Sequence, residues 1–456
     1  MQTILIPITT NFFSRNFFRT DAYRLLKAES DIRMVFLVPA ERIKYYSSEF
    51  GHERSVFAPL KDSSGVLSER LFKFLEVSSI HTRTATYQQM TELTRDGAQA
   101  GIVKRLPIFL FQRLFWAFGM FRIWRALIRF VYGAFPSAEY GDVFKNYRPD
   151  LVFCPTLLYA ENLFLKEAKR RDIRTAGLVH SWDNFYSKAI LRVHPDILLV
   201  HTDSIRDQAV RFGDFPKERI RVIGIPQYDM FFRREGIMPR NEFFRRIGGN
   251  PSKKLILYAF SGKAGLTIDF EMLAVLSKIK SELGGGVEVL IRPYPRFDLS
   301  EEKLDEVRKR YGFLGERALY HVGMGKQSWE FDDDSLSFLS SSMYHADVVI
   351  NLYSTFFVES ALFGKPLIAP AFDISPRNYW NSARRFFEWE HLDDIRRHGA
   401  IRFARSPEEL SGYIRTALSG NSGNVLTLDS LIQKEVQYTD GKSGERLTHT
   451  LLELLR

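Results

Sequence analysis

Residues 346–373 read ADVVINLYSTFFVESALFGKPLIAPAFD, and this stretch predicts a strand, a helix and a second strand. A short apolar run ends at Ser354 and Thr355, a helical pattern follows, and Gly364 ends it before another apolar run. Parallel strands need a crossover connection of a dozen or more residues, which is usually a helix. The stretch therefore indicates an α/β protein with a parallel sheet.

Small hydroxyl residues lie where the first of these strands meets the helix. The free backbone N–H groups and the positive end of the helix dipole favour an anion at Ser354 and Thr355. Glu359 lies four residues after Thr355, so it projects from the same face one turn deeper. A phosphate at this junction with a ribose hydroxyl bonded to Glu359 would form a nucleotide-diphosphate site. The alternative is that Ser354 only caps the helix and that Glu359 is a solvated surface residue.

The rest of the chain alternates strands and helices on both sides of 226–250, a stretch that contains prolines and a glycine pair. This alternation predicts two doubly wound, Rossmann-like domains, residues 1–230 and 251–385, followed by a helical segment over 386–456. Ligands of such sheets bind outside the carboxyl ends of the strands. We therefore expect two domains that face a central cleft, with the functional residues at strand ends.

Composition limits the class of protein. The 456 residues suit two domains, and 45% hydrophobic with 26% charged residues is typical of a folded globular protein. The single cysteine, Cys154, excludes a disulfide framework and a multi-thiolate metal site, and it fits a small buried hydrophobe better than a nucleophile. MQTILIPITT at the start predicts a strand rather than a signal peptide. The net charge of +10 indicates an anionic partner: nucleic acid, a membrane surface or a phosphorylated substrate.

The segment HSWDNFYSK, residues 180–188, follows the predicted strand 175–179 and concentrates polar groups at its end. General-base catalysis needs an imidazole or carboxylate within hydrogen-bond reach of the acceptor, which suits His180 or Asp183. The alternative is a structured turn in which the Asp and Asn side chains bond the local backbone. The candidate acceptor-binding residues beside them are Trp182, Asn184 and Lys188.

A glycine-containing loop, SGKAG at 261–265, joins the first strand of the second domain to its first helix. Ser261, Gly262 and Lys263 would let backbone N–H groups and a cation approach a phosphate. The GxxxxGK[ST] pattern of a Walker A loop is absent, and a glycine in such a loop usually only makes the turn.

The sequence RPYPR at 292–296 follows another predicted strand of the second domain. Pro293 and Pro295 stiffen the segment, and a rigid Arg292 would hold a diphosphate bidentately. An ordinary surface arginine is the competing interpretation.

Residues 101–136 carry six basic residues and no acidic one among many aromatic and aliphatic residues. Arg122, Arg125 and Arg129 share one helical face. A basic, aromatic-rich amphipathic segment favours docking on an anionic membrane. The alternative is a pair of core-facing helices with snorkelling arginines.

Several of these stretches together resemble GT-B-fold glycosyl- and glycerophosphotransferases of bacterial surface-polysaccharide assembly, in particular the CDP-glycerol glycerophosphotransferase-like family. SWDNFYSKA resembles the family's SWDN-x-x-SKG segment, and RVIGIPQYDMF resembles the end of its first domain. RPYPR lies where the family often carries R/K-P-H-P, and VVINLYSTFFVESALFGKPLI resembles its D-hydrophobic-S-S/T-hydrophobic-E helix with the following G-K-P. The resemblance covers roughly residues 180–229 and 255–373.

The resemblance implies that the nucleotide binds the second domain and the acceptor the first. It implies Ser354, Thr355 and Glu359 for donor binding, with Arg292 near the phosphates, and it puts Asp183 with His180 on the acceptor side. Asp183 is favoured as the base because a carboxylate stays ionised at neutral pH. One departure matters: Tyr294 replaces the histidine of the PHP segment, so the role of that histidine cannot be carried over.

We expect a metal-independent GT-B glycosyltransferase with no cofactor beyond its nucleotide-sugar donor. A lipid-linked glycan or a polysaccharide of capsule, O-antigen or teichoic type would be the acceptor, and inversion of stereochemistry is expected. The partners would be donor, acceptor and the anionic inner face of the cytoplasmic membrane, reached through 101–136, with no nucleic acid. Alternatives are a CDP-alcohol phosphotransferase, a hydrolysing nucleotide-sugar 2-epimerase, or a non-catalytic basic membrane scaffold.

Overall fold

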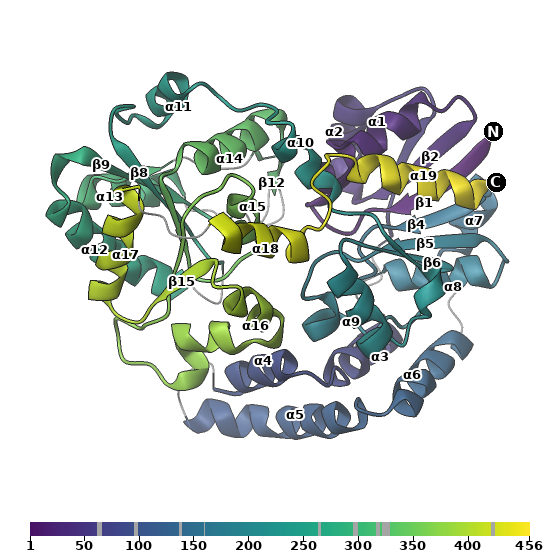
Figure 1. The fold of residues 1–456 in the computed structure, drawn as a ribbon. Helices are drawn as coiled ribbons and strands as arrows, with labels where there is room; N and C mark the ends of the chain where they lie inside the picture. The colour runs from purple at the N-terminus through teal and green to yellow at the C-terminus, as the bar shows by residue number, and fades with distance from the viewer. Residues whose placement is uncertain are drawn as a thin grey trace. The chain divides into compact units, whose positions relative to one another are not determined.

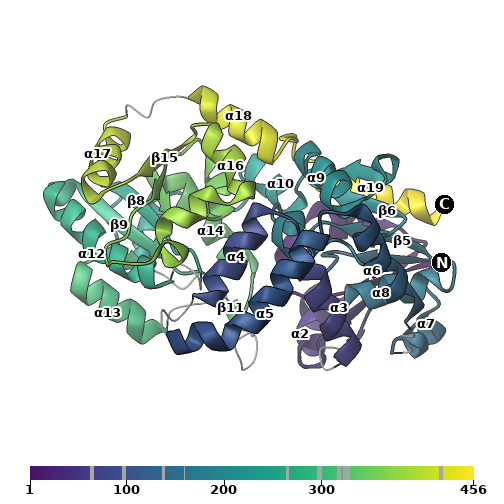
Figure 2. The ribbon, with the colours of Figure 1, turned by 90° about the horizontal axis from the view of Figure 1, so that it is seen from below.

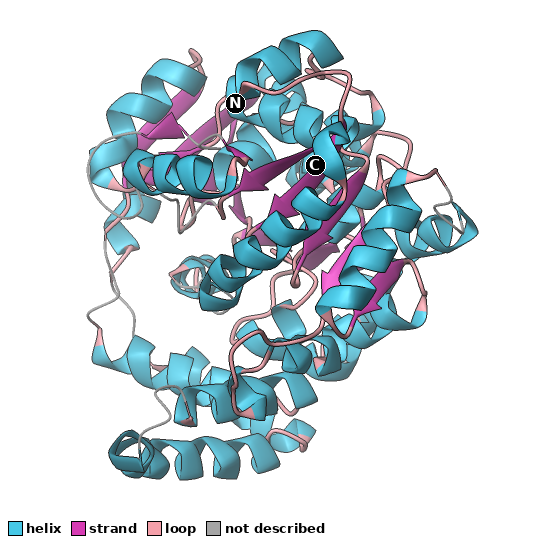
Figure 3. Ribbon diagram, turned by 90° about the vertical axis from the view of Figure 1, so that its left-hand side faces the viewer, coloured by secondary structure: helices cyan, strands magenta, loops and turns pink. Residues whose placement is uncertain are grey.

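The computed structural model describes residues 1–61, 66–94, 99–135, 139–158, 160–262, 266–294, 300–315, 320–321, 329–420 and 425–456. The chain forms two compact units, each built on its own sheet (Figure 1). Unit 1 comprises Met1–Asp229 with Gln437–Arg456, and unit 2 comprises Met230–Val436. Helices lie on both faces of the strands, as Figure 3 shows.

Unit 1 contains a seven-stranded parallel sheet in the order β3-β2-β1-β4-β5-β6-β7. Strands buried on both faces read as continuous apolar runs. In β1, Ile4 and Ile6 pack into one core cluster and Leu5 into the other. The strand bounds are β1 Gln2–Pro7, β2 Ile32–Val38, β3 Ser55–Pro59, β4 Leu151–Cys154, β5 Arg174–Leu178, β6 Ile197–Val200 and β7 Ile220–Val222.

The helices of unit 1 connect these strands and cover the sheet. Their bounds are α1 Asp21–Ala28, α2 Ile43–Phe50, α3 Leu67–Ser78, α4 Arg83–Leu93, α5 Gln99–Phe118, α6 Arg122–Ala134, α7 Gly141–Tyr147, α8 Glu161–Lys169 and α9 Asp203–Gly213. A short helix, α10 (Asp229–Phe232), begins at the boundary with unit 2.

The C-terminal helix α19 (Ser443–Leu455) belongs to unit 1. Leu447 and Leu451 are fully buried in the core cluster that also holds Ile4 and Ile6. The buried carboxylate of Asp229 accepts hydrogen bonds from the N–H groups of Ser443 (3.1 Å) and Gly444 (2.8 Å). These hydrogen bonds connect the start of α19 to Asp229, the residue at which the first segment of unit 1 ends.

Unit 2 contains a six-stranded parallel sheet in the order β10-β9-β8-β13-β14-β15. The strand–helix–strand unit predicted from 346–373 is confirmed, because β13 and β14 pair in parallel on either side of α15. The strand bounds are β8 Lys254–Ala259, β9 Val287–Arg292, β10 Leu314–Gly315, β13 Val348–Asn351, β14 Leu367–Pro370 and β15 Ile401–Ala404. A separate ribbon pairs β11 (Tyr320–His321) with β12 (Trp329–Glu330).

The helices of unit 2 are α11 Arg240–Ile247, α12 Leu266–Glu282, α13 Glu301–Tyr311, α14 Asp333–His345, α15 Phe356–Ala361, α16 Glu390–Arg397, α17 Pro407–Leu418 and α18 Val425–Glu435. The stretch 386–456, expected to be helical, also contains the edge strand β15. This strand has only four residues, and Arg402 in it is exposed, so its apolar pattern is too short to stand out from the helices around it.

The segment 101–136 forms two helices, α5 and α6, bent by 110° relative to each other. They pack on α3 and α4 of unit 1, alongside which they run in Figure 2. Within the described residues no single helix is long and apolar enough to cross a membrane, and α5 with α6 meet that description only as a bent pair.

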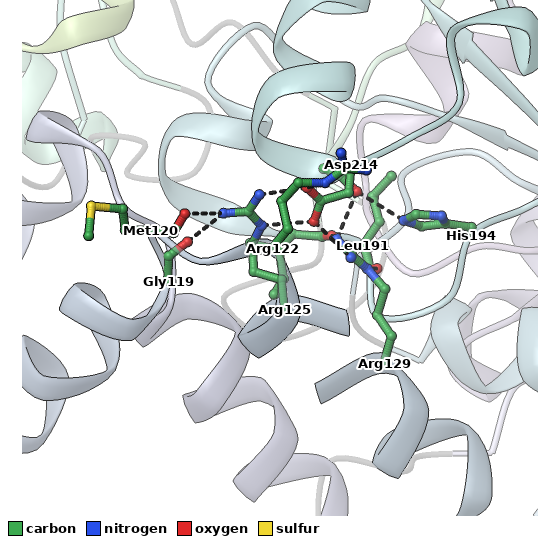
Figure 4. A network of polar contacts seen from close by, with 10 residues as sticks. Gly119, Met120, Arg122, Arg125, Arg129, Leu191, His194 and Asp214 are labelled. Carbon is green, nitrogen blue, oxygen red and sulfur yellow. Dashed lines mark hydrogen bonds and ion pairs between the residues drawn. The ribbon is translucent and has the colours of Figure 1, made fainter. Parts of the chain in front are cut away.

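The arginine face of α6 is turned towards the protein, which corrects the expected role of these arginines. Arg125 donates to the Asp214 carboxylate at 2.8 and 2.5 Å, and Arg129 donates to it at 2.9 Å (Figure 4). Arg129 also donates to the carbonyls of Ile190 and Leu191. Arg125 and Arg129 are therefore not available to lipid headgroups, because a carboxylate distant in sequence binds them. Arg122 lies 3.2 Å from Asp214 but keeps an exposed side chain.

Replacing Asp214 by alanine is expected to destabilise the protein by about 3–5 kcal/mol, because two largely buried guanidinium groups lose their counter-charge. Burial raises the pKa of Asp214, but the hydrogen bonds from Arg125 and Arg129 outweigh burial and keep this pKa below its ordinary value. Asp207→Ala on α9, the helix that ends just before Asp214, is the matched control, since the Asp207 side chain is 70% exposed. Thermal and urea unfolding measure the difference. A loss of stability below about 1 kcal/mol, the range of surface ion pairs, would contradict the role of Asp214 as the counter-charge of Arg125 and Arg129.

Candidate functional site

A pocket in unit 1 lies where the strand order of its sheet reverses. The order changes direction between β1 and β4, and at such a switch point the adjoining connections leave an opening at the carboxyl ends of the strands. About 370 Å³ of space, part of it open to solvent, lies at the pocket. Four polar side chains follow four strands into it: Thr10 after β1, Thr156 after β4, His180 after β5 and His201 after β6.

Aromatic and amide side chains complete the pocket wall. A helical turn, Ser14–Phe18, supplies Asn16 with Phe13 and Phe17, and Gln227 comes from the turn that precedes Asp229. A mostly apolar pocket with a few convergent polar groups is typical of a small-ligand site. The sequence pattern identified His180 but gave no sign that Thr10, Asn16 or His201 would lie beside it.

Both histidines of the pocket are neutral at physiological pH. Burial, and after it the positive charge of Lys188, lowers the pKa of His180 to about 3. Burial alone lowers the pKa of His201 to about 4. A neutral imidazole has one unprotonated ring nitrogen, so each ring can accept a proton or a hydrogen bond from a hydroxyl group. His180 is partly exposed as a residue and lines the pocket.

Glu161, at the first turn of α8, joins the strand ends beneath the pocket. Its fully buried carboxylate accepts hydrogen bonds from the hydroxyls of Thr9 (2.8 Å) and Thr156 (2.6 Å) and from the N–H groups of Thr156 (2.9 Å) and Leu157 (2.7 Å). The Leu157 backbone is left-handed, with φ of 57°, which is costly for a residue with a Cβ. Glycine at position 177 leaves room for this leucine, because a Cβ there would lie 2.4 Å from its side chain.

The remaining residues of the 180–188 segment lie outside the pocket wall. Lys188 donates to the Asp183 carboxylate at 2.7 Å and to the Ser181 hydroxyl at 2.9 Å. Trp182 packs on the core of unit 1. Asn184 is fully buried, and no hydrogen-bond partner of its side-chain amide is found within the described part of the chain. The structure therefore brings His180 to the pocket, and it holds Asp183 in an ion pair with Lys188 instead.

In unit 2 the strand order reverses between β8 and β13, and the predicted donor-binding residues lie at this second switch point. Ser261 and Gly262 follow β8, Arg292 ends β9, and Ser354 follows β13. Arg292 is buried, with its guanidinium carbon 5.6 Å from the centre of the Phe356 ring. Lys263 lies outside the described residues.

Contacts tie these turns to one another. The N–H of Phe260 donates to the carbonyl of Arg292, and the amide of Asn351 donates to the carbonyl of Ala259. Gly262 has φ of +90°, and a Cβ there would lie 3.3 Å from the Tyr294 ring, so this ring packs over the turn. The three motifs that the sequence separates by up to a hundred residues are thus neighbours in unit 2.

Two hydroxyl groups expected at the phosphates have partners within the protein. Ser261 donates to Asp269 through its N–H (2.9 Å) and its hydroxyl (3.2 Å), and Tyr258 donates to the same carboxylate at 2.7 Å. Ser354 accepts a hydrogen bond from the N–H of Phe356, the first residue of α15, at 3.1 Å, whereas the N-cap position itself is Thr355. Because α15 has only six residues, its dipole is a weaker reason for anion binding than the sequence suggested.

Glu359 and Asp269 are both buried carboxylates at this switch point. Glu359 is 5% exposed, so the alternative of a solvated surface residue does not hold. Burial raises the pKa of Asp269 to about 7, against the opposing hydrogen bonds from Ser261 and Tyr258. Sequence reasoning missed Asp269, whose only signal is an acidic residue in the first turn of the helix after the SGKAG loop.

Burial raises the pKa of Glu161 to about 7, although hydrogen bonds from Thr156, Thr9 and Leu157 oppose the rise. A carboxyl with a raised folded-state pKa stabilises the protein fully below its unfolded value of 4.5 and loses that contribution as pH rises through about 7. Glu161→Gln cannot ionise. We therefore expect the stability of the wild type relative to this variant to fall by about 3 kcal/mol between pH 4.5 and 8.

Urea unfolding of both proteins at several pH values measures this difference. The buried histidines are common to both proteins, so their effect cancels. A stability difference that stays constant over the range would mean that Glu161 is ionised throughout.

Solved structures share this architecture at low sequence identity. A UDP-GlcNAc 2-epimerase from Neisseria meningitidis, bound to UDP-GlcNAc, has a TM-score of 0.57 and 9% identity, with coverage of 99% of this chain and 100% of that chain. A UDP-GlcNAc 2-epimerase from Methanocaldococcus jannaschii has a TM-score of 0.54 and 13% identity, covering 99% of each chain. A glycosyltransferase from Rickettsia africae ESF-5 has a TM-score of 0.50 and 10% identity, also covering 99% of each.

These likenesses concern the fold, and they confirm the predicted GT-B-like class with two parallel sheets. A comparison with curated protein sequences finds no match. A family model described as CDP-glycerol:poly(glycerophosphate) glycerophosphotransferase matches residues 194–453, which is more than half of the chain and includes the whole of unit 2. The family suspected from the four motifs is thereby confirmed: the chain belongs to the CDP-glycerol:poly(glycerophosphate) glycerophosphotransferase family of transferases.

Proposed function

We propose that this protein transfers a sugar from a nucleotide-diphosphate donor to a hydroxyl group of a bacterial surface glycan or its lipid-linked precursor. Family membership supports the general class, a transferase with a nucleotide-activated donor. The observation that carries the proposal is the pocket of unit 1, in which the neutral His180 lies among hydroxyl, amide and imidazole side chains at the switch point. Such a lining suits a polyhydroxylated acceptor.

In the proposed step, His180 takes the proton of the acceptor hydroxyl while that oxygen bonds to the anomeric carbon. The nucleoside diphosphate leaves with the electron pair of the broken bond, and a single displacement of this kind inverts the configuration. The low pKa makes His180 by itself a weak base, and negative charge on the reacting groups raises that pKa as the proton arrives. This assigns the base to His180 instead of Asp183, which the sequence favoured, because Asp183 is held by Lys188.

For the donor we propose the switch point of unit 2. Arg292 supplies a buried guanidinium for the diphosphate, and Glu359 supplies a buried carboxylate for ribose hydroxyls. Support comes from the convergence of the turns after β8, β9 and β13 on one edge of the sheet, where ligands of doubly wound sheets bind. The family match spans these turns.

A second candidate is transfer of glycerophosphate from CDP-glycerol, and the family description is the observation that favours it. Tyr294 stands where the PHP segment of the family carries a histidine, so the role of that histidine has no counterpart here for either reaction. The two reactions break different bonds. Attack on phosphorus of CDP-glycerol releases CMP, whereas attack on an anomeric carbon releases a nucleoside diphosphate.

The leaving nucleotide therefore tests the proposal. Purified protein is incubated with CDP-glycerol or with UDP-, GDP- and CDP-sugars, with and without a glycan acceptor, and the nucleotides are separated by anion-exchange chromatography. A nucleoside diphosphate released only with acceptor supports sugar transfer, and CMP supports the second candidate. A nucleoside diphosphate released equally without acceptor would indicate an epimerase-type or hydrolytic reaction and would overturn the proposal.

His180→Asn is expected to lower turnover about 10²–10⁴-fold with donor affinity unchanged, since the proton acceptor is lost. Asp183→Asn should lower turnover much less, and His449→Asn, whose ring is 74% exposed on α19, serves as the control. Steady-state kinetics and donor titration measure both quantities for each variant. Near-normal turnover in a folded His180→Asn protein would exclude this histidine as the base.

Glu359→Gln is expected to weaken binding of the matching nucleotide by about 1–3 kcal/mol, because a hydrogen bond to a charged group becomes a neutral one. Isothermal titration calorimetry with UDP, GDP and CDP measures the affinity. Glu306→Gln, an exposed carboxylate on α13 of the same unit, is the control. Equal affinities in the two folded variants would place the nucleotide elsewhere.

A further inference from the structure

The helices α5 and α6 present a large apolar face to solvent. The exposed fraction of Ile108, Phe111 and Leu114 on α5 is 57%, 58% and 48%, and that of Ile123, Leu127 and Phe130 on α6 is 81%, 49% and 75%. Met120 and Phe121, between the helices, are also more than half exposed. Most of the exposed large apolar side chains in the described chain lie in this one segment. A contiguous apolar surface on a folded protein normally binds a partner or a membrane.

The polar side of the two helices is occupied by the protein itself. Arg113 donates to the Thr86 hydroxyl at 2.9 Å and Arg105 to the Leu93 carbonyl, both on α4 or its end. Arg125 and Arg129 are bound by Asp214 (Figure 4). Four of the six cations of the segment are therefore directed towards the protein, as are the buried Ile128 and Tyr132, whereas the exposed apolar side chains face solvent.

We infer that the apolar face of α5 and α6, here defined as Ile108, Phe111, Leu114, Ile123, Leu127 and Phe130 with their exposed apolar neighbours, inserts into the interface of a lipid bilayer. The pair together has the length and apolar composition of a broken membrane span. Its 110° bend prevents one straight passage, whereas two helices lying in the membrane plane can each bury exposed apolar side chains among acyl chains.

Charge supports lipid over a second protein as the occupant. The two helices contain no Asp or Glu, and their exposed cations are Lys104 and Arg122. Residues of this kind at the edge of an apolar face match the headgroup layer, in which phosphates lie beside the acyl chains. The chain as a whole carries a net charge of +10, which also favours an anionic surface.

This mode of docking differs from the one that the sequence suggested. Apolar burial supplies the binding energy. Electrostatic attraction is small, because the exposed cations are Lys104 and Arg122, and Arg122 is already within 3.2 Å of Asp214. Salt screens exposed charges but does not weaken burial of apolar surface. The docking inferred here does not depend on which group the protein transfers.

Vesicle sedimentation at two salt concentrations separates the two modes. The full chain is mixed with vesicles of phosphatidylcholine alone, or of phosphatidylcholine with 30% phosphatidylglycerol, at 0.1 M and 0.5 M NaCl. We expect binding to both vesicles, tighter to the anionic ones, and 0.5 M NaCl should remove only the difference between them. No binding to phosphatidylcholine, or complete loss at 0.5 M NaCl, would overturn the inference.

Matched substitutions locate the inserted surface. Ile123→Asp and Phe130→Asp should each lower the partition coefficient roughly tenfold or more, the value expected for withdrawing one large apolar side chain from lipid. Leu67→Asp on α3 is the control, because Leu67 is 78% exposed and lies outside the segment. All three positions are exposed, so thermal unfolding should change little. An equal effect of all three substitutions would contradict insertion of this face.

A fluorescent label gives an independent readout. Cys154 is fully buried, so Ile123→Cys and Leu67→Cys each provide a single accessible thiol for an environment-sensitive dye. With vesicles, the dye at position 123 should shift to shorter wavelength and be quenched by brominated lipids, and the dye at position 67 should not. Sedimentation velocity without lipid tests a second copy as the occupant. Self-association abolished by Phe130→Asp, together with an unquenched dye, would assign the face to a protein interface instead.

Discussion

A reversal of strand order in a parallel sheet leaves strand ends that neighbouring connections cannot cover, and both candidate sites lie at such reversals. Each unit meets this constraint with a buried carboxylate in the first turn of the helix that follows a central strand. Glu161 binds the turns after β1 and β4, and Asp269 binds Ser261 after β8. For both carboxyls burial raises the pKa to about 7. The two carboxylates thereby fix the strand ends and leave the space beyond these ends open for a ligand.

Much of the architecture follows from apolar periodicity, which is a local property. The alternation of apolar runs and helical patterns predicted two doubly wound units because strands buried on both faces are recognisable one at a time. The edge strand β15 was not predicted, because its four residues, one of them exposed, carry too little of this apolar pattern. The membership of α19 in unit 1 depends on distant contacts: Thr448 bonds Ala22 of α1 at a separation of 426 residues, and Gly444 bonds Asp229 at a separation of 215.

The candidate sites show the same division between local and distant information. His180 could be predicted because it follows a strand directly. The places of His201 and Thr10 in the pocket follow only from the strand order, which puts β6 beside β5 and β1 beside β4. The orientation of α6 could not be predicted either. A helix with an arginine face and an apolar face can be turned either way, and Asp214, some ninety residues later, decides it by binding Arg125.

The placement of α19 also determines the order in which the molecule can be completed during synthesis. In the chain, unit 2 is an insertion between Asp229 and Gln437 of unit 1. Leu447 and Leu451, which fill the core beside Ile4 and Ile6, leave the ribosome only after the whole of unit 2. Until then one face of the unit 1 sheet lacks part of its cover. Unit 1 can therefore be completed only after unit 2 has been synthesised. Until then the incomplete core of unit 1 exposes apolar surface, and the nascent chain needs protection from aggregation most at this stage.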